Sequence, residues 1–144
     1  MKALDIVKAA GVALALMVLN VAAAFAVVWV YGTFIEPGQE EAFYQAAAQR
    51  IAPWSSIFVG MPLFFGAGWV LTKRKPARNG VAFAAAFALI YAITDVSIIV
   101  AAGALASLSA IVVASMTTKL LAALAGARLA APHRTFLPHT EQER

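Results

Sequence analysis

Charged residues are scarce in this sequence. Asp, Glu, Lys and Arg make up only 12% of the 144 residues, whereas a typical soluble domain has about 25%. Hydrophobic residues make up 62%, so a globule of this size could not cover its surface with polar groups. The charges also cluster at both ends and in two short breaks between long apolar runs. These shortages exclude a soluble enzyme and a disordered chain, and they indicate an integral membrane protein.

Cysteine is absent, which excludes a disulfide scaffold, a thiolate metal site and a cysteine nucleophile. The two histidines, His133 and His139, lie in a polar tail and lack metal-ligand spacing. The sequence has no serine–histidine–acid arrangement and no glycine-rich phosphate loop. We therefore expect no metal, no cofactor and no enzymatic activity.

The chain does contain four long apolar runs. The shortest has nineteen residues, and at 1.5 Å per residue it is about 28 Å long, enough to span the hydrocarbon of a bilayer. The predicted fold is all-α: an integral membrane bundle of four transmembrane helices in one domain, residues 1–126, followed by a cytoplasmic tail, 127–144. The spans are predicted at residues 9–34, 54–72, 80–102 and 105–125. Pro53 is expected to open the second helix and Gly126 to end the fourth.

The break between the first two spans is polar and acidic. It begins with a turn at 36–38 and continues with Glu40, which suits the first turn of a helix. Beyond it, Phe43, Ala47 and Ile51 recur at every fourth position. This spacing predicts a short amphipathic helix on the membrane surface. The alternative is a plain loop, because so short a segment is only a marginal helix.

The basic residues predict the orientation of the chain. The net charge is +4, and most of the excess lies in the loop 73–78 and at the two ends. Four spans place all these segments on one side, which the positive-inside rule assigns to the cytoplasm, so both termini are expected inside. The alanine-rich spans and short loops are compatible with a bacterial inner membrane. The expected partners are the lipid bilayer and further copies of the chain or other membrane subunits, and no nucleic acid.

Small residues predict how the helices pack. Alanines recur at every fourth position on the third and fourth spans: Ala84, Ala88 and Ala92, then Ala106, Ala110 and Ala114. Helix association in lipid depends on close backbone approach, which small residues permit. The stripes therefore predict a tightly packed hairpin of the third and fourth helices. Lys119, near the cytoplasmic end of the fourth span, is expected to extend its side chain to the headgroups.

Asp95 is the one acidic residue deep inside a predicted span. A carboxylate at a helix centre costs about 2.5–3.5 kcal/mol on insertion scales, so a polar partner, a water-filled cavity or protonation should offset it. Tyr91 lies four residues earlier on the same face, and Asn20 lies at a similar depth in the first span. We expect Asn20 and Asp95 to form a buried pair, which Ser107 and Ser115 of the fourth span could join.

Two interpretations of Asp95 stay open. It binds a proton, an ion or a substrate, or it forms a structural clasp with Asn20 between helices. Gly60 and Pro62 in the second span carry a similar choice. Pro62 lacks a backbone donor and crowds the preceding turn, which predicts a kink; the alternative is a broken helix that exposes backbone groups to a substrate.

Two functions are compatible with these features. The first is a non-enzymatic accessory, interaction or assembly subunit of the inner membrane, which the lack of a catalytic constellation and the small-residue stripes favour. The second is a small-solute or proton-coupled transporter or channel centred on Asp95. Since four helices enclose little volume, transport is expected to require a dimer.

Overall fold

The computed structural model describes residues 2–103 and 110–131 and is helical almost throughout. Helix α1 (Ala3–Val30) continues into a π-helical turn, η1 (Tyr31–Ile35), and is followed by α2 (Glu41–Lys73), α3 (Gly80–Ala101) and α4 (Ala110–Ala130). Each of the four α-helices is long and apolar enough to cross a membrane. The prediction of an all-helical chain with four helices long and apolar enough to span a membrane is therefore confirmed.

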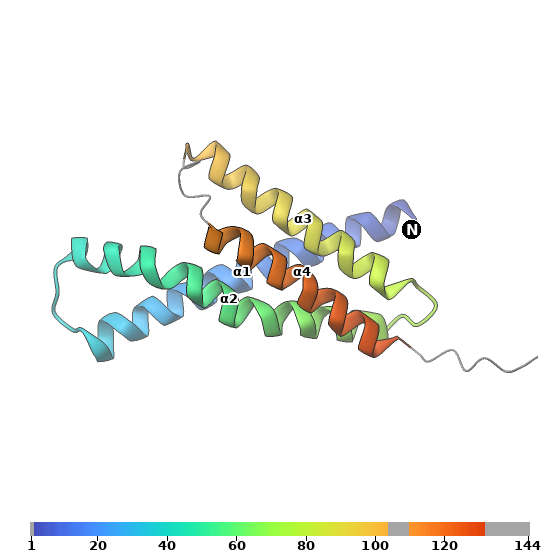
Figure 1. Cartoon of the computed structure of the whole chain (residues 1–144), viewed down its shortest axis with the longest axis horizontal. Helices are drawn as coiled ribbons and strands as arrows, with labels where there is room; N and C mark the ends of the chain where they lie inside the picture. Colours follow the sequence, from blue (N-terminus) through green and yellow to red (C-terminus); the bar gives the residue numbers. More distant parts are fainter. Residues whose placement is uncertain (1, 104–109, 132–144) are drawn as a thin grey trace, which may run out of the picture.

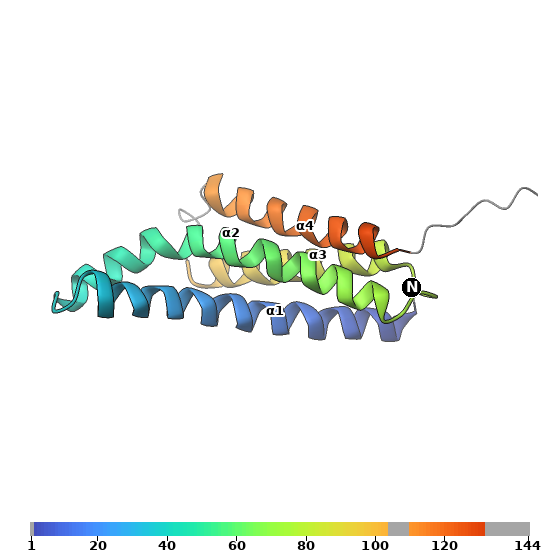
Figure 2. The same ribbon diagram turned by 90° about the horizontal axis from the view of Figure 1, so that it is seen from below.

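The helices alternate in direction and form a ring in the order α1, α2, α4, α3 (Figures 1 and 2). The start of α1, the α2–α3 loop and the end of α4 lie together at one end of the bundle, drawn on the right in both views. This end carries the basic loop 73–78. We call it the basic end, and we call the opposite end, with the α1–α2 connection, the acidic end.

Helix α2 differs from the prediction at its start. The segment expected to lie as a separate amphipathic helix on the membrane surface is the first part of α2, and Pro53 lies inside the helix rather than at its opening. The reason is local: the Tyr44 side chain fixes the first turn of α2 to the turn that follows η1. The Tyr44 hydroxyl donates to the Glu36 carbonyl oxygen at 2.8 Å and accepts from the Gln39 amide at 3.1 Å. These bonds hold the first turns of α2 alongside η1.

The two halves of the bundle differ in length. Together α1 and η1 cover 33 residues, as does α2, whereas α3 has 22 and α4 has 21. At 1.5 Å per residue, α1 with η1 and α2 are each about 50 Å long, whereas α3 and α4 are each about 32 Å long. The α1–α2 hairpin therefore projects beyond α3 and α4 at the acidic end (Figure 1).

The prediction of a tight third–fourth hairpin is wrong, because α4 packs mainly against α2. Two glycines allow this approach. A Cβ atom on Gly126 would collide with the Phe65 carbonyl oxygen of α2, and one on Gly68 would collide with the Ala123 carbonyl oxygen of α4. Gly126 is thus a contact point inside α4, not its end, and the helix continues to Ala130.

The predicted alanine stripes on α3 and α4 differ in burial. On α3, Ala84 and Ala88 are buried. On α4, Ala110 and Ala114 are exposed, and Ala106 lies outside the described residues. The buried face of α4 is instead formed by five other residues: Ser115, Lys119, Ala123, Gly126 and Ala127. Alanine alone did not identify this face because it occurs on every side of the helix.

Candidate functional site

The centre of the bundle holds polar side chains from all four helices. Asn20 comes from α1, Ser56 from α2, Tyr91 from α3, and Ser115 and Lys119 from α4. We call these five residues the polar cluster. Lys119 is the most deeply buried of them, with 2% of its surface exposed. An ammonium group in such a position is costly unless other groups compensate it, so its surroundings decide what the site can do.

The Lys119 ammonium group is held by hydroxyl groups. Its Nζ donates to Ser56 Oγ at 2.7 Å and to the Tyr91 hydroxyl at 3.1 Å. Nζ also lies 4.8 Å from the centre of the Tyr91 ring, within the range of a cation–π contact. Within the described residues no carboxylate forms an ion pair with Lys119 at 4.0 Å or less. The charge is therefore hydrogen-bonded but not neutralised by direct contact.

The prediction that Lys119 reaches the headgroups is wrong. Helix α4 continues for eleven residues beyond Lys119, to Ala130, a rise of about 16 Å that the side chain cannot cover. The side chain turns inward because α2 offers space at Gly60, where a Cβ atom would collide with Lys119 Cε. Gly60, singled out from the sequence as part of a helix break, thus accommodates the lysine.

Asn20 lies in the interior as predicted, but its partners are not those expected. Its Nδ2 donates to Ser56 Oγ at 3.0 Å and to the Tyr91 hydroxyl at 3.3 Å. No hydrogen bond joins it to Asp95 in the described part of the chain. Its Oδ1 is buried and has no hydrogen-bond partner among the described residues. Ser56 and Tyr91 therefore each bridge Asn20 and Lys119.

Asp95 lies one turn from Tyr91 on α3, at the edge of a cavity of about 590 Å³ between α2, α3 and α4. The cavity wall also includes Gln49, Ser56 and Ser115. Ser56 and Ser115 belong to the polar cluster as well, and their hydroxyl oxygens are 3.5 Å apart. The cavity thus connects the Asp95 carboxyl group with the hydroxyl groups around Lys119.

An apolar core closes the bundle between the polar cluster and the basic end. Phe64, Phe83 and Phe87 are fully buried there. The Phe64 ring packs edge-on against Tyr91, with 4.9 Å between the ring centres. In this arrangement the polar cluster borders a cavity on the acidic side and a closed aromatic layer on the basic side.

The remaining predicted residues are placed as follows. Helix α2 continues through Pro62, so the helix is not broken there. Ser107 lies outside the described residues. Ser56 was missed as a site residue because the predicted second helix began at residue 54. The observed helix begins at Glu41, which places Ser56 deep in the helix.

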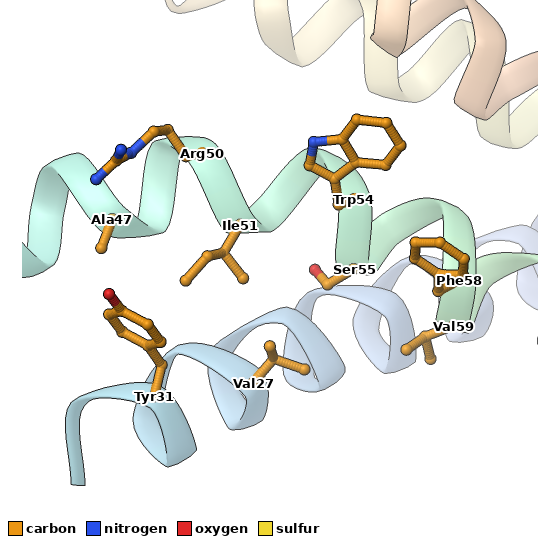
Figure 3. A pocket seen from close by; sticks show the side chains of 9 residues that line it. All are labelled: Val27, Tyr31, Ala47, Arg50, Ile51, Trp54, Ser55, Phe58 and Val59. Atoms are coloured by element: carbon orange, nitrogen blue, oxygen red, sulfur yellow. The ribbon is translucent and has the colours of Figure 1, made fainter. Parts of the chain in front are cut away.

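A second cleft, of about 560 Å³, lies between α1 and α2 in the projecting hairpin. Figure 3 shows Tyr31 and Ile51 pointing toward one another across it, while Arg50 points away from α1. Its wall is mainly apolar, and it includes none of the polar cluster. No group of three or more His, Asp or Glu side chains placed to hold a metal ion occurs in 2–103 or 110–131. The cavity at Asp95 is therefore the stronger candidate site.

Comparisons with protein-family models, curated proteins and solved structures gave no match for this chain.

Proposed function

We propose that this chain is a small transporter that moves protons through the site between Asp95 and Lys119. The observation that carries the proposal is the buried lysine without a contacting carboxylate, next to a cavity lined by Asp95. Ionisable groups inside membrane spans typically mark ion pathways and proton relays. Asp95, Ser115, Ser56 and Lys119 offer a sequence of groups that accept or donate protons between the cavity and the bundle centre.

The aromatic layer at Phe64 and Phe87 closes the path beyond Lys119. A proton that has reached the lysine can leave toward the basic end only after these helices move. The geometry therefore favours a site that is open to one side at a time, as in alternating access, over an open channel.

Substitution of Asp95 by asparagine tests this function. In liposomes with a trapped pH-sensitive dye and an imposed pH gradient, the wild-type chain should dissipate the gradient. The Asp95→Asn variant should fall to the rate of empty liposomes, because the amide keeps the shape of the carboxyl group and cannot carry the proton. The matched control is Ser97→Ala, an exposed hydroxyl two residues away on α3, which should keep the wild-type rate. Equal rates for wild type and Asp95→Asn would contradict the proposal.

We further propose that the basic end faces the cytoplasm of a bacterial inner membrane, with both termini inside. The positive-inside rule supports this, since the loop 73–78 and the start of α1 lie together at that end (Figure 1). The chain has no cysteine, so single cysteines can report the orientation. A membrane-impermeant thiol reagent added to intact cells should label the Glu40→Cys variant and leave the Arg74→Cys variant unlabelled until the cells are opened. Labelling of both variants in intact cells would contradict the four-span orientation.

The second candidate function is an accessory or assembly subunit that acts by binding other membrane proteins or further copies of itself. The α1–α2 hairpin favours it, because along its length it exposes several large aromatic side chains: Phe25, Trp29, Phe34, Trp54 and Phe58. Absence of proton flux from the wild-type chain, together with a membrane protein that copurifies in mild detergent, would favour this candidate.

A further inference from the structure

A pocket at the basic end combines four cations with an apolar wall. It has a volume of about 440 Å³ and is lined by Lys8 of α1 and by Arg74, Lys75 and Arg78 of the α2–α3 loop. We call these four residues the basic pocket. Its apolar wall is formed by Val12 and Ala15 of α1, Leu71 of α2 and Phe83 of α3. Because it joins positive charge to the apolar surface of the spans, its chemistry differs from that of the polar cluster.

Arg78 is held in place within this pocket by contacts that leave its charge without a direct partner. Its Nη2 donates to the Leu71 carbonyl oxygen at 3.1 Å, and its guanidinium carbon lies 3.4 Å from the centre of the Phe83 ring. Its Nε is buried without a hydrogen-bond partner among the described residues. Partial burial lowers the pKa of Arg78, and the charge of Asp5 partly offsets this. Arginine nevertheless stays charged in proteins.

From this arrangement we infer that the basic pocket binds the headgroup of an anionic phospholipid. None of its four cations forms an ion pair at 4.0 Å or less in the part of the chain that the structure describes, and Asp5 is the acidic group whose charge acts on Arg78. The phosphate would lie against Lys8, Arg74 and Lys75. The acyl chains would follow the groove beside Gly11, where a Cβ atom would meet no other atom within 4 Å. Basic pockets between helices at the cytoplasmic face are typical sites for anionic headgroups.

The apolar wall favours a lipid over a soluble phosphate compound. A soluble phosphate would use the cations and leave Val12, Ala15 and Leu71 without a partner. A phospholipid uses both surfaces of the pocket, and the positive-inside rule places the basic end beside the leaflet that carries anionic lipid.

Native mass spectrometry of the full chain released from nanodiscs with phosphatidylglycerol and phosphatidylcholine tests the inference. The wild-type chain should retain phosphatidylglycerol in preference. Lys75→Gln should lower that retention about fivefold, as expected for one cation near an anionic surface. Gly11→Leu should lower it without changing the charge, because the new side chain occupies the groove. The matched controls are Arg128→Gln, an exposed cation outside the pocket, and Gly66→Leu, a glycine that likewise has open space around it. Both should retain the lipid as the wild-type chain does.

Four results would overturn the inference. If phosphatidylcholine is retained equally, the pocket does not select an anionic headgroup. If Gly11→Leu has no effect, or Arg128→Gln lowers retention as much as Lys75→Gln, only diffuse charge attraction is present. If millimolar inorganic phosphate displaces the lipid completely, the pocket is a site for soluble phosphate. Thermal unfolding of each variant shows whether a loss of lipid comes from a loss of fold.

Discussion

Replacing Gly126 by alanine should lower the free energy of unfolding by about 2–3 kcal/mol, the upper part of the range for added methyl groups in a packed interior. The new Cβ atom would collide with the Phe65 carbonyl oxygen and lie within about 3 Å of the Trp69 amide nitrogen. Both atoms belong to the backbone of α2, so no side chain can rotate away to make space. The two helices would have to separate along their closest contact.

Equilibrium unfolding in mixed detergent micelles measures this effect. The matched control is Gly66→Ala, because a Cβ atom at Gly66 meets nothing within 4 Å. There the substitution should be neutral or stabilising by up to about 1 kcal/mol, since alanine favours the helical backbone more than glycine does. A similar decrease in the free energy of unfolding for both variants would mean that the close α2–α4 contact at Gly126 does not determine the stability of the bundle.

The sequence predicts the number and approximate bounds of the helices because long apolar runs leave a chain few alternatives in a membrane. It does not predict which helices touch. Alanine covers several faces of α3 and α4, so regular alanine spacing selects no unique face. The close contact between α2 and α4 instead depends on Gly68 and Gly126. Because neither residue has a side chain, the two helix backbones can meet there. That coincidence arises between segments distant in sequence, so it is visible only in the folded chain.

The candidate site was only partly visible for the same reason. Asp95, Asn20 and Tyr91 can be identified from the sequence because polar residues are conspicuous in apolar spans. Lys119 stands out in the same way, but the direction of its side chain depends on where α4 ends and on the space at Gly60. The sequence does not point to Ser56 because Pro53 precedes it. Proline commonly opens a helix, but Pro53 lies inside α2. The predicted start of the second helix is about four turns too late. For this reason the sequence places the Ser56 hydroxyl at the membrane surface instead of at the bundle centre.

The contacts in the polar cluster predict that Ser56→Ala and Lys119→Met change the free energy of unfolding to different extents. Ser56→Ala should lower the free energy of unfolding by about 1–3 kcal/mol, because it removes a hydrogen-bond partner and leaves a buried donor unsatisfied. Ser56 accepts from both Lys119 and Asn20, so two donors lose a partner. Lys119→Met should cost less than Ser56→Ala, or even stabilise the bundle, because it removes the buried charge and keeps most of the volume.

The same unfolding measurement on both variants, with the proton-flux assay beside it, distinguishes two roles for the polar cluster: a transport site and a structural clasp between helices. A residue kept for function can reduce stability, so in a transport site Lys119→Met should be folded, at least as stable as Ser56→Ala, and inactive. In a structural clasp the lysine would be the element that holds the helices together. Lys119→Met would then be the more damaging of the two substitutions, and flux, if present, would be lost only with the fold. The order of the two stabilities therefore tests whether the buried ammonium group serves the stability of the bundle or a proton pathway.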